Sequence, residues 1–335
     1  MGGQAYTAPM VLLTTSAHDL DRAGEAIRAG FLVAIPTETV YGLGADAWNT
    51  VALARVFEAK RRPSFDPLIV HIADPQGASE LADLTVPYAA ILSERFWPGP
   101  LTMVLPKLDK VPDLATSGLP TVAVRCPAHT VARQIIARSG VPVAAPSANP
   151  FGYLSPTRAE HVVAQLGNRV DFIVDGGRCL VGVESTVLDL SSDPPLVLRP
   201  GGLPVELLAE VIPGLQVFDR ATTSPRAPGQ LPSHYAPSKP LYLVNSGRLS
   251  GARPGGNAAA ICFGAVSTQS AIQSGRWAKV VDLSPLRNPV EAAAGLFDTL
   301  HALDTTDLAE LWAERLPDDG LGRAVNDRLY KASVK

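Results

Sequence analysis

The stretch FLVAIPTETVYGLGADAW, residues 31–48, predicts both a fold class and a site. Its opening run, FLVAIP, is hydrophobic and typical of a buried strand. The polar residues Thr37, Glu38 and Thr39 follow at once, and the glycines of Gly-Leu-Gly (42–44) predict a turn after them. Because ligands of α/β proteins bind beyond the ends of strands, two hydroxyls and a carboxylate at this point indicate a binding site.

Helical and strand patterns alternate on both sides of this stretch. A helical pattern that ends at Gly30 precedes it, and the run TVALARVFEAKRR (50–62) follows with apolar residues on one face and Asn49 or Thr50 as N-cap. Only SSDPP (191–195) joins the last two strand patterns of this region, so the sequence predicts an α/β fold with a twisted, open, mixed sheet rather than a purely parallel one. The further strand patterns lie at 68–72, 101–106, 121–127, 141–146, 172–177, 185–190 and 196–202.

The composition changes near residue 214. Few aliphatic residues and prolines at 225, 228, 232, 237 and 240 predict an extended, solvated linker, in which His234 and Tyr235 stand out. Strand and helix patterns then resume and predict a small Rossmann-like α/β domain. The expected boundaries are 10–213 for the large domain, 214–239 for the linker and 240–335 for the small domain.

Charge and cysteine content narrow the class of protein. The net charge of −3, from 29 basic and 32 acidic residues, gives no reason to expect a nucleic-acid coat. Cys126, Cys179 and Cys262 are too scattered for a disulfide framework or a metal site, which favours a reducing compartment. No apolar run reaches the ~18 residues of a membrane helix, and the N-terminus lacks the regions of a signal peptide. We therefore expect a cytoplasmic protein without a membrane partner.

Standard nucleotide and hydrolase motifs are absent from the sequence. It contains no P-loop, no HExxH and no GxSxG pattern, and residues 42–48 lack the third glycine of a dinucleotide fingerprint. Any nucleotide would therefore bind to some other surface.

The segment EAKRRPSFDPLIVH (58–71) combines cations with a buried strand. Lys60, Arg61 and Arg62 can complement a helix dipole, but they can also hold a polyphosphate. His71 is either a satisfied core histidine or a ligand-binding group. Arg125, at the end of another apolar strand, needs a partner, which is either an internal carboxylate or an anionic ligand.

Small and hydroxylated residues follow the strand at 141–146. Ser147, Asn149 and Ser155 lie in the loop after it, where small neighbours let a ligand approach the backbone. Thr157 and Glu160 have the spacing of a capping box for the next helix.

Two more strand ends carry polar groups. Glu184, Ser185 and Thr186 begin one strand, and Arg199 ends the next. Each has an ordinary interpretation as turn chemistry or solvation of a strand end. Together with the segments above, they indicate the rim of one concave site, to which the hydroxyls after residue 36 belong.

Seen together, these segments resemble the threonylcarbamoyl-AMP synthase family, whose catalytic domain has the YrdC-like fold. The motifs that carry the resemblance are PTETVYGLG, AKRRPSFDPLIVHI, WPGPLT, VAVRCP, APSAN with SPT, DGG with GVEST, and LRPG, in that order. They cover residues from about 15 to 212, and HYAP with the trailing domain resembles the longer, two-domain members. The resemblance implies a deep, basic cavity.

The resemblance also implies a reaction. L-threonine, bicarbonate and ATP, carrying Mg²⁺ on its phosphates, give threonylcarbamoyl-AMP and pyrophosphate. The product passes transiently to a transferase that modifies the adenosine beside the anticodon of certain tRNAs, which does not require this chain to bind tRNA directly.

Matching the motifs position by position assigns residues to the substrates. L-threonine is expected at Thr39, His71, Arg125, Ala145 and Ser185. ATP is expected at Lys60, Arg62, Asp66, Thr121, Ser147, Asn149, Ser155, Arg199, His234 and Tyr235. The catalytic groups implied are Lys60, Arg62 and His71, and the linker with its aromatic pair would act as a lid. Asp66 departs from the family, which often has asparagine there, and a carboxylate beside a triphosphate would repel it unless a metal ion intervenes or only the backbone of Asp66 touches the ligand.

Two alternatives belong to other classes. An RNA-binding module would use a basic cavity and linker, but the net charge of −3 disfavours it because phosphate neutralisation dominates such binding. A carbamoyl-adenylate enzyme of hydrogenase maturation would add acylphosphatase-like and zinc-finger modules, which a sequence with three scattered cysteines lacks.

Overall fold

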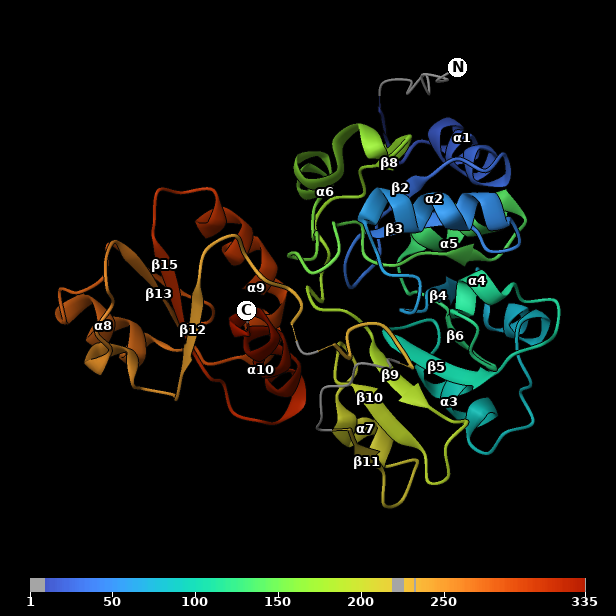
Figure 1. Cartoon of the computed structure of the whole chain (residues 1–335). Helices are drawn as coiled ribbons and strands as arrows, with labels where there is room; N and C mark the ends of the chain where they lie inside the picture. The colour runs from blue at the N-terminus through green and yellow to red at the C-terminus, as the bar shows by residue number, and fades with distance from the viewer. Residues whose placement is uncertain (1–9, 219–225, 232, 335) are drawn as a thin grey trace.

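A computed structural model describes residues 10–218, 226–231 and 233–334 of the chain. The opening MGGQAYTAP and the linker residues Pro225 and Pro232 lie outside the described residues. The first domain (residues 10–218) contains an eleven-stranded sheet, and the C-terminal domain (residues 240–334) contains a four-stranded sheet (Figure 1). We call the described residues between them, 226–231 and 233–239, the strap.

The large sheet is mixed, as the sequence predicts. Its order is β1-β8-β2-β3-β7-β4-β6-β5-β9-β10-β11, in which β2 pairs antiparallel with β3 whereas β4 pairs parallel with β6. The last strand, β11, falls inside the segment expected as linker and lies parallel to β10. The bounds are β1 (Val11–Leu13), β2 (Val33–Ile35), β3 (Gly42–Asp46), β4 (Ile69–His71), β5 (Leu101–Pro106), β6 (Thr121–Arg125), β7 (Val143–Ala144), β8 (Phe172–Val174), β9 (Thr186–Asp189), β10 (Leu196–Arg199) and β11 (Gln216–Val217).

The predicted turn at residues 42–44 is wrong, because these glycines lie in strand β3. The chain reverses earlier, between β2 and β3, and Ala34 pairs with Leu43 across the two strands. Glycine is needed in β3 because its neighbours lie close: a Cβ atom on Gly42 would lie 3.1 Å from the Cβ of Ala145. The chain therefore reverses at the polar residues 37–39 and not at the glycines.

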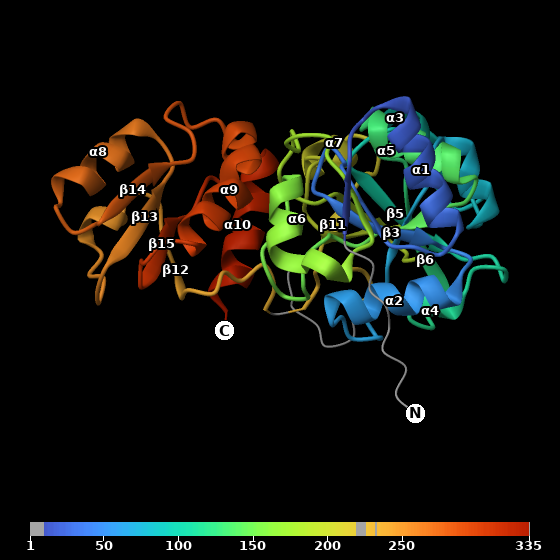
Figure 2. The ribbon, with the colours of Figure 1, turned by 90° about the horizontal axis from the view of Figure 1, so that it is seen from above.

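Helices cover both faces of the large sheet. Helices α1 (Ala17–Arg28) and α5 (Thr130–Ser139) pack together on one face, and α2 (Thr50–Lys60) and α4 (Asp113–Thr116) lie on the other (Figure 2). Strand β2 shows why both faces are apolar, since Val33 and Ile35 pack with the α1 and α5 side chains while Ala34 packs with the α2 side. The remaining helices of this domain are α3 (Ala89–Phe96), α6 (Ala159–Leu166) and α7 (Val205–Ala209).

Local capping signals succeed at one helix and fail at another. Asn49 caps α2 as predicted, because its Oδ1 accepts hydrogen bonds from the backbone N–H groups of Val51 and Ala52 at 3.0 and 3.1 Å. The predicted capping box of Thr157 and Glu160 is wrong. Helix α6 begins after Arg158 without a side-chain cap, and the Thr157 hydroxyl donates instead to Asp298 of the C-terminal domain at 2.5 Å.

The C-terminal domain is a parallel sheet with helices on both sides, as the sequence predicts. Its strand order is β12-β15-β13-β14. Helices α9 and α10 face the first domain, and α8, which the sequence analysis missed, lies on the far side (Figures 1 and 2). The bounds are β12 (Leu241–Val244), β13 (Ala258–Cys262), α8 (Ala265–Gln273), β14 (Lys279–Asp282), α9 (Pro289–Asp304), β15 (Glu310–Glu314) and α10 (Gly320–Ser333).

The strap is buried rather than solvated, which corrects the prediction for this segment. Ala227, His234 and Tyr235 are all less than a tenth exposed. Helix α10 holds the strap at two points: Lys331 Nζ donates to the carbonyl of Gly229 at 2.7 Å, and the His234 N–H donates to the carbonyl of Lys331 at 3.3 Å. The strap is therefore a chain of turns and bends that is clamped between the two domains.

None of the described helices combines the length and the apolar character needed to cross a membrane.

Two histidines stack where the domains meet. The rings of His161 (α6) and His301 (α9) lie 3.8 Å apart at an interplanar angle of 18°. Burial and the neighbouring His301 lower the pKa of His161 to about 4, although Asp298 opposes the shift. Burial also lowers the pKa of His301. Both imidazoles are therefore neutral near pH 7.

We expect the free energy of unfolding to fall as the pH drops from about 6.5 towards 4. The unfolded chain binds protons at these histidines in that window while the folded chain does not, so protonation favours unfolding. After allowance for solvent screening, the effect of His161 is about 1 kcal/mol. Urea unfolding at several pH values measures it. His161→Phe keeps the stacked ring and should flatten the dependence, whereas His18→Phe, at an exposed site in α1, should not. An unaltered pH profile in His161→Phe would contradict this account.

Candidate active site

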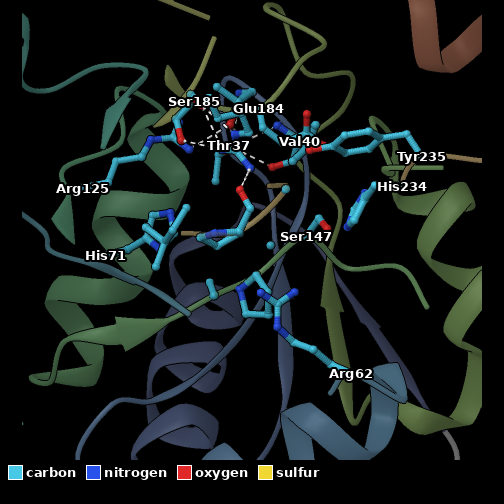
Figure 3. A pocket seen from close by; sticks show the side chains of 18 residues that line it. Thr37, Val40, Arg62, His71, Arg125, Ser147, Glu184, Ser185, His234 and Tyr235 are labelled. Atoms are coloured by element: carbon cyan, nitrogen blue, oxygen red, sulfur yellow. Dashed lines mark hydrogen bonds between the residues drawn. The ribbon is translucent and has the colours of Figure 1, made fainter. Parts of the chain in front are cut away.

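One cavity lies where strands of the large sheet end, and the strap forms one of its walls (Figure 3). The structure brings most of the predicted site residues together in its lining: Thr39, Arg62, His71, Arg125, Ala145, Ser147, Ser185, Arg199, His234 and Tyr235.

The polar turn after β2 is organised around Thr37. Its hydroxyl donates to the carbonyl of Val40 at 2.6 Å and lies 2.8 Å from the hydroxyl of Thr39. The next aromatic residue, Tyr41, donates to the carbonyl of Gly177 at 2.8 Å and so ties the turn to the DGG segment. The hydroxyls of this turn therefore shape the wall of the cavity, and that of Thr39 also accepts a hydrogen bond from Arg125 at the end of β6.

Arg125 connects this turn with the end of β6. Its guanidinium donates to Thr39 Oγ1 at 2.9 Å and pairs with Glu38 Oε1 at 2.6 Å. Burial raises the pKa of Glu38, but Arg125 outweighs it and lowers the pKa overall. The sequence allowed either an internal carboxylate or an anionic ligand as the partner of Arg125, and in the structure an internal carboxylate, that of Glu38, pairs with it. The arginine still lines the cavity, so an anionic ligand can share it.

His71 ends β4 next to Arg125 in the parallel register. It is 3% exposed, and its Nδ1 has no hydrogen-bond partner among the described residues. Burial and the charge of Arg125 lower the pKa of His71 to about 3. It is therefore a neutral imidazole on the cavity wall, not a core histidine with both nitrogens satisfied.

Lys60 supports the cavity from behind instead of lining it. Its Nζ donates to the carbonyls of Ser147 and Asn149, both at 2.5 Å. Burial and the charge of Arg62 lower the pKa of Lys60 well below its usual value, and the charges of Asp66 and Glu184 oppose this shift. The lysine thus holds the loop that presents Ser147, which is a different role from a simple helix-dipole partner.

Asp66 neutralises Arg62. Its Oδ2 lies 2.8 Å from Arg62 Nη2, and the guanidinium also donates to the carbonyls of Asp66 and Pro67 at 2.9 and 2.8 Å. Burial raises the pKa of Asp66, and Arg62 opposes this. Because the carboxylate is fully buried against Arg62 and does not line the cavity, the expected repulsion of a triphosphate is relieved by this ion pair.

Arg199 ties β10 to β9 and to the strap. It donates to the carbonyl of Ser185 at 2.8 Å and to that of Pro228 at 3.1 Å. The hydroxyl of Ser185 lies 2.8 Å from that of Thr102. Position 201 has to be glycine for its backbone to lie this close to that of Ser185, because a Cβ atom on Gly201 would collide with the Ser185 backbone.

Glu184 is the acidic residue of the cavity lining. One oxygen accepts a short hydrogen bond from Ser155, and the other pairs with Arg328 of helix α10 at 2.7 Å. Burial alone would raise the pKa of Glu184, but Arg328 and Arg199 lower it to about 2. The carboxylate is therefore charged, and both of its oxygens have partners.

The strap places two aromatic rings against the cavity. Tyr235 has a left-handed backbone with φ of 62° and is 1% exposed. Its ring lies 4.1 Å from that of His234, which in turn meets Phe151 edge-on at 5.6 Å. Such backbone strain in a buried residue is typical of functional positions, because the surrounding structure has to impose it.

Comparison with known proteins identifies the family. Residues 25–201 match the family described as "Telomere recombination", which groups Sua5, YciO and YrdC, and residues 203–334 match "Threonylcarbamoyl-AMP synthase, C-terminal domain". A threonylcarbamoyl-AMP synthase of Pyrococcus abyssi is 44% identical over 92% of this chain and 92% of its own length. The chain belongs to the threonylcarbamoyl-AMP synthase family. The resemblance based on the sequence motifs is thereby confirmed.

Further relatives of the family span both domains. A threonylcarbamoyl-AMP synthase of Bacillus subtilis is 42% identical over 96% of this chain and 94% of its own length. The crystal structure of P. abyssi Sua5 complexed with L-threonine has a TM-score of 0.86 and 38% identity, and the match covers 97% of this chain and 98% of that chain. The two-domain architecture is therefore that of a long synthase.

Some residues assigned to the synthase site do not line the cavity. Thr121 lies at the far end of β6 from Arg125, opposite Pro106 of β5, and is partly exposed. Asn149 is fully buried and donates to the carbonyls of Pro150 and Tyr153, both at 2.9 Å, so it shapes the loop. The remaining residues of this kind are Lys60, Asp66 and Ser155, which contact lining residues instead.

Other lining residues were absent from the predicted set. Val40 comes from the turn between β2 and β3, Gly42 and Ile69 come from strands, and Pro228 and Gly229 come from the strap. Apolar and glycine positions carry no chemical signature in a sequence, so only the fold identifies them. Thr37, Pro146 and Glu184 lie in motifs that the sequence analysis noticed but did not assign to a substrate.

Charge in the lining is mainly positive. The charged side chains that line the cavity are Arg62, Arg125 and Arg199 against Glu184. Within the described ranges, no group of three or more His, Cys, Asp and Glu side chains has the arrangement of a metal site. The cavity therefore suits anionic ligands.

Proposed function

We propose that this chain synthesises L-threonylcarbamoyl-AMP from L-threonine, bicarbonate and ATP, with release of pyrophosphate. The observation that carries the proposal is the set of three arginines in one cavity of a threonylcarbamoyl-AMP synthase fold. One arginine suits a carboxylate, and the other two suit a polyphosphate, so a single cavity can hold both substrates.

L-threonine binds between Arg125 and His71 in this proposal. Arg125 holds the substrate carboxylate, with Thr39 and Ser185 as hydroxyl partners and Ala145 allowing close approach. His71 contributes a neutral imidazole with an unpaired nitrogen, which can form a hydrogen bond with the amine of the substrate and so orient it.

ATP binds against Arg62, Arg199 and Ser147, where Tyr235 closes over the nucleotide with His234 beside it. Figure 3 shows Ser147, His234 and Tyr235 near one another. Lys60, Asp66 and Ser155 act through the lining residues that they contact, and Asn149 acts through the loop that it shapes. Thr121 would have to be reached by a part of ATP that extends beyond the cavity.

The reaction then needs little covalent participation by the protein. The deprotonated amine of threonine captures CO2 derived from bicarbonate, and an oxygen of the resulting carbamate attacks the α-phosphate. The bond between the α- and β-phosphates breaks, and pyrophosphate leaves beside Arg62. Positioning and charge stabilisation supply most of the rate enhancement in such transfers, and a closed cavity protects the carbamate from water.

Mg²⁺ would accompany the triphosphate. The carboxylates nearest to the cavity, Glu38, Asp66 and Glu184, each pair with an arginine. The ion would therefore be held by the phosphates, where it neutralises charge on the leaving group. A cytoplasmic location and transient transfer of the product to a tRNA-modifying transferase are further parts of the proposal.

The test is pyrophosphate release from ATP and Mg²⁺, with threonine and bicarbonate each omitted in turn. We expect release only when both are present. Release without threonine would refute the choice of substrate but leave adenylation in place. No release at all, together with salt-sensitive RNA binding, would favour the RNA-binding alternative.

Tyr235→Ala should increase pyrophosphate or phosphate release without threonine, or raise the KM for ATP about tenfold, because the strap loses the ring that covers the cavity. Tyr235→Phe should behave like the wild type, since the hydroxyl of Tyr235 has no hydrogen-bond partner among the described residues. Tyr330→Ala, at a half-exposed site on α10, is the matched control. Wild-type kinetics in Tyr235→Ala would remove the lid from the mechanism.

A further inference from the structure

Helix α10 of the C-terminal domain sends one arginine into the first domain. Arg328 is 1% exposed and belongs to the largest fully buried side chains of the described residues. Its Nε lies 2.7 Å from Glu184 Oε2, and its Nη1 donates to the carbonyl of Pro200 at 3.0 Å. The guanidinium carbon lies 5.0 Å from the ring centre of Tyr235.

Glu184 creates an electrostatic problem that Arg328 solves. Its carboxylate lines a cavity proposed to hold a triphosphate, and an unpaired negative charge there would repel that ligand. Burial makes the problem larger, because a charge at 6% exposure is weakly screened by water. The counter-charge comes from a residue 144 positions away in the chain.

The same arginine also meets the strap. Tyr235 lies in its left-handed conformation with Arg328 over one side of the ring, and Lys331, one turn further along α10, holds Gly229 and His234. A cation above a buried aromatic ring stabilises the position of that ring. One face of α10 therefore supports the acidic part of the cavity lining and its aromatic wall together.

We propose that Arg328 is a positioning residue of the ATP site, and that the C-terminal domain completes this site by neutralising Glu184 and orienting Tyr235. The proposal rests on the proposed function, and it assigns a role to a domain whose sequence indicated none. Arg328 acts through Glu184 and Tyr235, because it is not among the residues that line the cavity.

A double-mutant cycle separates this role from a purely structural one. Arg328→Met should raise the KM and the Kd for ATP about tenfold or more, with a much smaller change for threonine, because the unpaired Glu184 repels the triphosphate. In a Glu184→Gln background the same substitution should change ATP affinity less than about threefold, because the carboxylate of the lining is gone. Asp327, the other ionic partner of Arg328, keeps its pair with Lys331 at 2.7 Å. Among the side-chain contacts of Arg328, only that with the Tyr235 ring is then lost without replacement. Equal effects in both backgrounds would overturn the proposal.

Arg323→Ala is the matched control. Arg323 lies on the same helix and also pairs across the domains, with Glu206 at 3.0 Å, but it does not line the cavity. It should leave the affinity for ATP unchanged, and a loss equal to that of Arg328→Met would indicate general damage to the domain interface. Tm values of all variants record folding.

Two further results keep the test decisive. If Arg328→Met fails to fold while the Glu184→Gln/Arg328→Met variant folds, the coupling through Glu184 is supported. If neither variant folds, Arg328→Lys provides the test. We expect Arg328→Lys to weaken ATP binding about threefold and to leave threonine binding unaffected. An unchanged affinity for ATP, or equal losses of affinity for ATP and threonine, would overturn the proposal. Calorimetry measures ATP binding without turnover, so it tests the effect of Arg328 on ATP affinity even if no synthase activity is found.

Discussion

Arg125→Ala is expected to raise the KM for L-threonine by about 100-fold or more and to abolish threonine-dependent pyrophosphate release. Arg125 is the lining arginine that ends β6, and it already contacts Thr39, a predicted threonine-binding residue, at 2.9 Å. Removing a buried guanidinium costs the charge-assisted hydrogen bonds to the substrate carboxylate, and no other lining cation lies beside Thr39 in the hydrogen-bond network. The KM for ATP should change much less.

The same substitution leaves Glu38 buried without its partner. We therefore expect a loss of stability of about 3 kcal/mol, because a buried charge then lacks compensation. Arg125→Ala combined with Glu38→Gln should recover most of this stability but not the affinity for threonine. Arg138→Ala, which removes a surface pair with Asp21 at 2.7 Å, is the control for both measurements. Retained threonine dependence in a folded Arg125→Ala protein would refute the assignment of the carboxylate site.

Lys60→Met should produce the second large effect, a loss of about 3 kcal/mol in the free energy of unfolding together with weaker ATP binding. The carbonyls of Ser147 and Asn149 each accept a hydrogen bond from Lys60 at 2.5 Å, and the methionine side chain offers no donor. The Asn149 carbonyl then loses its donor, and the Ser147 carbonyl keeps only the N–H of Asn149 at 3.0 Å, so the loop that presents Ser147 to the cavity is held less firmly.

Urea unfolding and the KM for ATP measure this prediction in parallel. Lys110→Met is the matched control, because Lys110 pairs with Glu80 at 3.4 Å in a setting where both side chains are more than half exposed. Surface pairs of this kind contribute less than about 1 kcal/mol. If Lys60→Met retained wild-type stability while ATP binding collapsed, Lys60 would contact the nucleotide itself and our supporting role for it would be wrong.

Local sequence patterns were sufficient where the determining interactions are local. The hydrophobic run before Pro36 becomes β2, and Asn49 caps α2, because strand burial and N-capping depend on neighbouring residues. The gathering of Thr39, Arg125 and Ser185 was also predictable, since polar groups at strand ends of an α/β sheet converge on one edge. The family resemblance added the identity of the substrates.

Non-local contacts decided the remainder. Gly42 pairs within the sheet and lies close to Ala145, and Thr157 caps no helix because its hydroxyl donates a hydrogen bond to Asp298 of another domain. Composition predicted a solvated strap, yet Arg328 and Lys331 of α10 bury it. All of these partners are far away in the sequence, so a pattern of neighbouring residues cannot predict the contacts.

The fold class, the order of the two domains and most of the cavity's polar groups could be predicted from the sequence alone, because hydrophobic periodicity and strand-end chemistry are short-range properties. The way in which the buried charges are compensated could not. Asp66 faces Arg62 instead of the cavity, and Arg328 reaches Glu184 across 144 positions of the chain. Charge compensation in a buried site depends on distances in space, and separation along the chain carries no information about them.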